Sequence, residues 1–361
     1  MKNGKTLLEL AQEIERQKTA KKDFVADTRQ LKLEDDGKTL SLEGTGSFAT
    51  RDLALQQIAA HTGVPVPYVR RMQDEAPELL AKNVNHWFQT KSSPRLVRTL
   101  DNGARAFLSN RYQRIDNAEV AETVIPVLQE VASRVGDMEI ASCEITESRL
   151  YLKAIFPGIR GTVTKARQVG DVIEAGVLIS NSEVGLGAVS IRAFSRRLVC
   201  LNGMTRDGGN SWRHVGKRIE ESEDIRQLLT DEAVEADDRA LLLKVRDVVA
   251  ATVSQDRFDQ WIARMNDAAE RPLKGDIPAA ITLLGRATSL RVEEQSSVLR
   301  HLIEGGDLSQ WGLANAVTRA SADVTSYDRA SELEVIGGQV IDLPATQWRQ
   351  IAEAEPLAQA A

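Results

Sequence analysis

Four strand-like segments follow one another between residues 139 and 200 of the chain. They read EIASCEI, SRLYLKAIF, GDVIEAGVLISNSE and AVSIRAFSRRLVC. The connections between them are too short to hold the crossover helices that parallel neighbours require. The middle of the chain is therefore predicted to be an α+β unit, in which a mostly antiparallel central sheet carries flanking helices.

The region before this sheet is predicted to contain a helix, a hairpin and a pair of helices. Residues 1–20 place leucines and alanines on one helical face. Alternating leucines flank Asp36-Gly37, where a hairpin turn favours glycine. In residues 51–72, Ala59, Gly63 and Val69 follow the spacing of a helix-turn-helix: a small residue, a turn glycine and an apolar residue. That helix pair fits either a recognition helix in DNA or a corner used only for packing.

After residue 217 the sequence becomes acidic and helical in its periodicity, so we expect an all-helical C-terminal region. These patterns divide the chain into four parts. They are an N-terminal helix, hairpin and helix-turn-helix-like segment in residues 1–90, an α+β core with basic strands in residues 91–217, a helical domain in residues 218–335, and a partly ordered tail in residues 336–361.

Composition narrows the classes of function. The chain has 361 residues and a formal net charge of -6, so nucleic acid would have to bind a local basic surface. Two cysteines make no disulfide framework, and the four histidines show no metal-ligand spacing. No phosphate-binding loop, dinucleotide fingerprint or nucleophile motif is complete. We therefore expect no catalytic residues, metal or cofactor, no membrane span or signal peptide, and a cytoplasmic location.

Basic residues concentrate in the strand-rich middle. Residues 188–218 contain seven arginines and lysines against one acid, and residues 91–114 contain six against one. Guanidinium groups pair with phosphates, and aromatic faces stack on bases. The residues that we expect to contact nucleic acid belong to these clusters, and they are Arg95, Arg98, Arg105, Arg111, Tyr112, Arg192, Phe194, Arg196, Arg197 and Arg206.

An alternative explains the same arginines without nucleic acid. They could form the solvent face of a half-buried sheet and pair with the chain's own acids. Arg196 and Arg197 are adjacent, so a regular strand points them to opposite faces. One of them is therefore expected to have a structural role, such as an ion pair.

Several blocks of sequence resemble a family found in bacteria, phages and plasmids, the domain of unknown function nine-three-two. The blocks are FLSNRYQRIDNAEV, GVLISNSEVGLGAVSI through RRLVCLNGM, and WGLANAVTRASAD, and the resemblance spans residues 48–330. The distribution of the family, with its α+β core and basic strands, is similar to that of single-strand-annealing proteins of the Redβ/RecT kind. This similarity implies an oligomer that holds single-stranded DNA in a basic groove.

We therefore predict a non-enzymatic, oligomeric nucleic-acid-binding protein that favours single-stranded DNA and promotes annealing or recombination. The loops SNRYQ and SNSEVGLG would form part of its groove. Two alternatives stay open. One is a self-assembling or partner-binding protein that uses the acidic helical region, and the other is a transcriptional regulator that uses residues 51–72.

Overall fold

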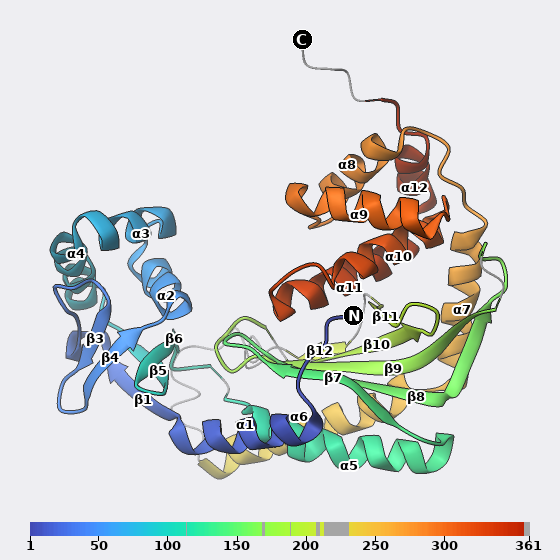
Figure 1. The fold of residues 1–361 in the computed structure, drawn as a ribbon. Coiled ribbons are helices and arrows are strands. Elements are labelled where there is room, and N and C mark those ends of the chain that lie inside the picture. Colours follow the sequence, from blue (N-terminus) through green and yellow to red (C-terminus); the bar gives the residue numbers. More distant parts are fainter. Residues whose placement is uncertain (113, 168–169, 188, 207–209, 213–230, 357–361) are drawn as a thin grey trace.

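The computed structural model describes residues 1–112, 114–167, 170–187, 189–206, 210–212 and 231–356. In Figure 1 these residues form two lobes. The N-terminal lobe comprises residues 22–112. The large lobe comprises residues 1–20 and the described residues from 114 onward. Among the helices of these ranges, none is both long and apolar enough to cross a membrane.

The N-terminal lobe is a six-stranded sheet covered by helices. Its elements are β1 (Lys22–Asp27), a 3-10 turn (Thr28–Gln30), β2 (Leu31–Leu33), β3 (Thr39–Leu42), β4 (Gly46–Thr50), α2 (Asp52–Thr62), α3 (Val66–Glu75), α4 (Pro77–Thr90), β5 (Pro94–Leu100) and β6 (Gly103–Ser109). The strand order is β1-β5-β6-β4-β3-β2, and β4 with β6 is the parallel pair. Ile58, Val84 and Phe88 from the helices pack against the sheet and form the core of this lobe.

Two local features predicted from the sequence are present in this lobe. β2 and β3 pair in antiparallel order on either side of Gly37, which adopts a φ of 65°. α2 ends at Gly63, which adopts a φ of 75°, and α3 begins at Val66. Glycine fits both turns because other residues are strained at positive φ. The predicted hairpin and helix pair are therefore confirmed as structure.

The large lobe is built on a second sheet, which is antiparallel throughout its described strands. Its first elements are α1 (Leu7–Ala20), α5 (Asn117–Val135), β7 (Glu139–Ile145), β8 (Leu150–Val163), β9 (Asp171–Asn181), β10 (Val189–Arg197), β11 (Asn202–Thr205) and β12 (Asn210–Trp212). The strand order is β11-β10-β9-β8-β7, and β12 pairs with β10 beyond the end of β11. The predicted α+β class with a mostly antiparallel central sheet is confirmed.

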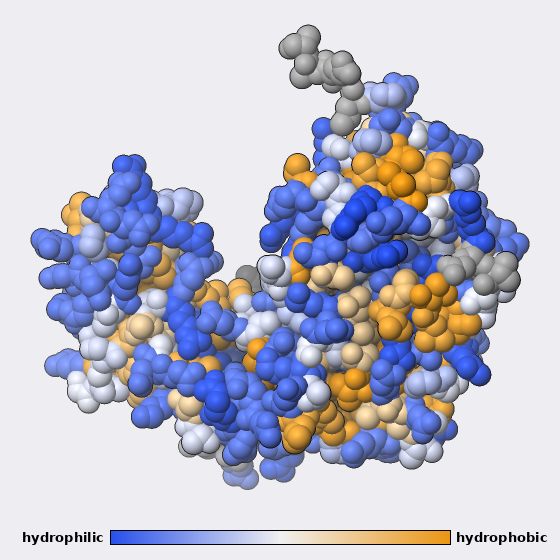
Figure 2. Space-filling model, in the orientation of Figure 1, coloured by the Kyte–Doolittle hydropathy of each residue, from blue (hydrophilic) through white to orange (hydrophobic). Residues whose placement is uncertain are grey.

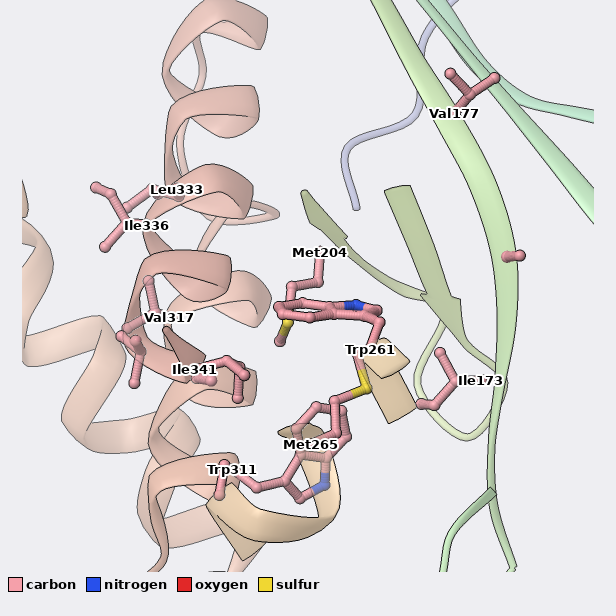
Figure 3. Close-up of a cluster of buried hydrophobic side chains, with 14 of the residues drawn as sticks. Ile173, Val177, Met204, Trp261, Met265, Trp311, Val317, Leu333, Ile336 and Ile341 are labelled. Atoms are coloured by element: carbon pink, nitrogen blue, oxygen red, sulfur yellow. The ribbon is translucent and has the colours of Figure 1, made fainter. Parts of the chain in front are cut away.

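Helices from the C-terminal part of the chain pack onto this sheet. They are α6 (Asp231–Thr252), α7 (Gln255–Ala269), α8 (Ile277–Ala287), α9 (Val292–Gly305), α10 (Gln310–Ala320), α11 (Tyr327–Ile341) and α12 (Ala345–Ala352). In Figure 1, α5 and α6 lie below the sheet and α10 and α11 lie above it. Figure 3 shows Trp261, Met265 and Trp311 from the helices gathered with Ile173 and Met204 from the strands. The predicted helical C-terminal region is confirmed, and it shares one core with the sheet.

The boundaries between lobes differ from the predicted divisions. β5 and β6 pair with β1 and β4, so a boundary at residue 91 would cut a sheet. The expected partly ordered tail contains the end of α11 and all of α12, and residues 357–361 lie outside the described residues. The difference at residue 91 arises from pairing between segments far apart in the sequence, which local patterns do not reveal.

Candidate nucleic-acid interface

The β9–β10 loop, of which residues 182–187 are described, contacts the N-terminal lobe. Its Glu183 is 5% exposed. Arg105 Nη2, from β6, donates to Glu183 Oε2 at 2.5 Å, and the backbone N–H of Asn117 donates to Glu183 Oε1 at 2.6 Å. The Tyr112 hydroxyl donates to the backbone oxygen of Ser182 at 2.7 Å. The structure thus brings together the two loops, SNRYQ and SNSEVGLG, that the sequence placed in one groove.

Arg98 lies behind this loop and is fully buried. Its Nε donates to Asp23 Oδ1 at 3.0 Å, its Nη2 to Asp116 Oδ1 at 2.6 Å, and its Nη1 to the backbone oxygen of Glu183 at 2.9 Å. Burial by itself would raise the pKa of Asp116, but Arg98 and Lys21 hold that pKa below its usual range. Arg98 therefore stabilises the contact between lobes, and its buried guanidinium has no face exposed to a phosphate.

Arg196 and Arg197 form ion pairs on the two faces of β10. Arg196 makes a bidentate pair with Glu139 at 2.6 and 2.7 Å, and its Nε donates to Glu174 at 3.0 Å. Arg197 Nε donates to the buried carboxylate of Asp171 at 2.6 Å. The opposite orientation expected of these neighbours is present, and each guanidinium has acidic partners.

These contacts correct the roles predicted for several residues. Arg98, Arg105, Arg196 and Arg197 are engaged with carboxylates, so we assign them to the fold and no longer to phosphate contacts. Phe194 is 2% exposed, so in this conformation its ring cannot stack on a base.

Arg206, a predicted phosphate contact of the second basic cluster, packs against the core of the large lobe. The Arg206 guanidinium lies 5.6 Å from the centre of the Trp261 ring. Arg206 follows β11, and its backbone N–H donates to the backbone oxygen of Ala193, in the middle of β10, at 2.9 Å. Arg206 therefore lies beside Trp261 of the large-lobe core.

An open cleft separates the two lobes in Figure 2, and the β9–β10 loop lies between the lobes in Figure 1. Arg149 donates to the backbone oxygen of Leu186 in this loop. Arg192 Nε donates to Ser190 Oγ at 3.2 Å, and Arg95 Nε donates to Ser93 Oγ at 3.2 Å. These three side chains bond to neutral groups, and among the described residues none of them forms an ion pair. Together with one exposed arginine of the SNRYQ loop they form a set that we name the cleft arginines: Arg95, Arg111, Arg149 and Arg192.

Arg149 was not among the predicted residues. It lies in the β7–β8 turn, outside both basic clusters of the sequence. Only the pairing of β8 with β9 brings that turn beside the β9–β10 loop. The sequence carries no local signal for this proximity.

His61 supports one of the cleft arginines. Its Nδ1 accepts a hydrogen bond from Arg95 Nη2 at 2.6 Å. Burial lowers the pKa of His61 to about 4, and the charges of Arg95 and Lys91 act in the same direction. His61 is therefore neutral at pH 7, and it positions the guanidinium of Arg95 without cancelling its charge.

A buried ion pair that sequence reasoning missed links the sheet to α11. Lys153 Nζ, from β8, lies 2.6 Å from Glu334 Oε2, and both side chains are fully buried. The ammonium also lies 5.0 Å from the centre of the Tyr327 ring. The alternation of Lys153 with apolar residues on β8 resembles a solvent-facing position, so only the placement of α11 reveals the pair.

The helix pair α2–α3 carries two exposed ion pairs. Arg70 lies 2.9 Å from Asp52, and Arg71 lies 2.8 Å from Glu75. These acids reduce the positive potential that attracts DNA phosphates. The contacts favour the packing interpretation of this helix pair over the recognition-helix interpretation.

The fold and these contacts define a class: a two-lobed α+β protein in which some arginines of the basic region form internal ion pairs and others bond to neutral groups. Within the described ranges, no group of three or more histidines, cysteines and acids is placed to hold a metal ion. A family model described as "Domain of unknown function (DUF932)" matches residues 106–326, more than half of the chain. The chain belongs to this family. No curated protein and no solved structure matches it.

Proposed function

We propose that the chain binds single-stranded nucleic acid, with DNA favoured, across the cleft between its lobes. In this proposal it acts as an oligomer that promotes annealing or recombination, and it catalyses no reaction. The observation that supports the proposal is the set of cleft arginines. They come from both lobes, Arg149 contacts the β9–β10 loop, Arg192 lies on the strand that follows it, and three of the four bond to neutral groups.

Phosphate contacts at the base of a cleft favour a single strand. A flexible strand can follow cations that come from separate turns and strands, and each contact releases bound counterions. Arginine also keeps its charge under all ordinary conditions and can bind a phosphate through two N–H groups. Binding of this kind depends on the nucleic acid backbone, so we expect weak sequence preference and strong salt dependence.

The combined variant Arg149→Glu and Arg192→Glu should bind a labelled oligothymidylate much more weakly than the wild type. A charge-assisted hydrogen bond contributes about 1.5–3 kcal/mol, so each substitution should raise Kd by about tenfold or more. The slope of log affinity against log salt should also become shallower by roughly 0.7 for each lost phosphate contact. Fluorescence anisotropy at several salt concentrations measures both quantities.

The matched control is Arg286→Glu, which makes the same change of charge at an exposed position on α8. This variant should bind with nearly wild-type affinity. If the combined cleft variant binds no more weakly than the Arg286→Glu control, the proposed interface is wrong.

A self-assembling protein is the second candidate, because the β10–β11 turn exposes apolar side chains. Leu198, Val199 and Leu201 are 39%, 47% and 57% exposed. Apolar surface of this kind often marks a contact with another protein. Light scattering distinguishes the candidates: assembly in the absence of nucleic acid, with no binding of oligonucleotide, would favour this one.

A further inference from the structure

The two lobes contact each other mainly around one loop. Glu183 binds Arg105 and its backbone oxygen accepts from Arg98, both from the N-terminal lobe. Beside it, Val184 packs in a small apolar cluster with Leu96, Ala106 and Leu108. We name Arg98, Arg105, Glu183 and Val184 the interlobe joint.

Outside this joint the lobes have separate hydrophobic cores. The N-terminal core contains residues from β1 to β6 and α2 to α4, such as Ile58 and Phe107. The core of the large lobe contains residues of α1 and of the elements from α5 onward, such as Leu128 and Trp311. The apolar cluster at the joint is much smaller than either. Domains that share only a small contact generally move relative to each other.

We infer that the two lobes rotate as rigid bodies about the interlobe joint, and that the cleft narrows when a nucleic acid strand binds. This inference rests on the proposed function. Arg95 and Arg111 belong to the N-terminal lobe, whereas Arg149 and Arg192 belong to the large lobe. A strand that contacts both pairs gains interactions as the lobes approach. A ligand shifts a conformational equilibrium by its difference in affinity for the two states, so such a strand favours the closed one.

The distance between lobes can be measured by single-molecule energy transfer in the full chain. Dyes would be attached at Lys82→Cys on α4 and Val292→Cys on α9, which are both exposed positions. Cys200 would be replaced by serine. Cys143 can stay, because it is buried and burial raises the pKa of its thiol to about 11, which keeps it unreactive toward the dyes.

Saturating oligothymidylate should shorten the mean distance between dyes by several ångströms. Without oligonucleotide, Glu183→Gln should broaden the distance distribution, because Arg105 loses its charged partner. Glu147→Gln is the matched control, since Glu147 is 77% exposed and lies 3.3 Å from Arg51 near the same contact. It should leave the distribution unchanged. Val184→Ala is a second joint variant that should also broaden the distribution without leaving a buried charge unpaired.

The outcomes separate this inference from the proposed function. An unchanged distance while anisotropy reports bound oligonucleotide overturns the closure and leaves the function standing. Absence of binding overturns the proposed function. Rotation about the interlobe joint is then tested only by the distance distributions of the variants measured without oligonucleotide. If neither Glu183→Gln nor Val184→Ala broadens the distribution relative to Glu147→Gln, rotation about the joint is wrong.

Discussion

Replacing Lys153 with methionine should lower the free energy of unfolding by about 3–5 kcal/mol. The substitution leaves the carboxylate of Glu334 buried and unpaired, since the Lys153–Glu334 pair is fully removed from solvent. A buried charge without a partner loses its hydration and gains nothing in return. Urea denaturation followed by circular dichroism measures the change in free energy.

Two comparisons show whether burial is the cause. Lys165→Met breaks a pair with Glu270 whose side chains are 55% and 56% exposed, so it should leave the free energy of unfolding nearly unchanged. The double variant Lys153→Met with Glu334→Leu removes both charges and should recover most of the lost stability. If Lys153→Met costs no more than Lys165→Met, α11 does not pack on the sheet as described.

Replacing Arg98 with methionine should have an effect of similar size, again about 3–5 kcal/mol. Arg98 is fully buried and forms ion pairs with the carboxylates of both Asp23 and Asp116. Without it, Asp116 keeps its pair with Lys21, and Asp23 keeps only a long contact with the exposed Arg114. Urea denaturation of the variant measures the loss.

Arg114→Met is the matched control for Arg98. Arg114 is 54% exposed and lies 3.9 Å from the same Asp23, so its removal should be nearly neutral. Measuring oligonucleotide binding as well as stability separates two possible roles of Arg98, one in the fold and one in phosphate contact. If Arg98→Met leaves stability unchanged but weakens oligonucleotide binding, Arg98 contacts phosphate and the assignment of this residue to the fold is wrong.

Local sequence patterns predicted most of the elements but not their partners. The spacing of leucines around Gly37 and the glycine that ends α2 are signals within a few residues, and both were sufficient. The membership of β5 in the N-terminal sheet was not predicted, because β1 pairs with it across 67 to 77 positions of sequence. Pairing over such separations depends on the whole fold, and no property of residues 91–100 alone specifies it.

The candidate site was predicted less well than the fold. Arg98 and Arg192 both occupy strands rich in basic residues, yet Arg98 is buried among carboxylates and Arg192 bonds to a serine. The acids that make this difference, such as Asp23 and Asp116, lie outside the strands that carry the arginines. Charge counts along the chain therefore located a basic region, but only the three-dimensional arrangement separates arginines paired with acids from those that bond to neutral groups.

Photo-crosslinking tests most directly whether nucleic acid occupies the cleft. An oligonucleotide that carries 5-bromouracil would be irradiated with the wild-type protein, and the crosslinked peptides would be identified by mass spectrometry. We predict crosslinks near Arg95 and Arg111, near Arg149, and near the β9–β10 loop and Arg192. Crosslinks confined to α3 or to residues 196–206 would contradict the account and place the nucleic acid on a different surface.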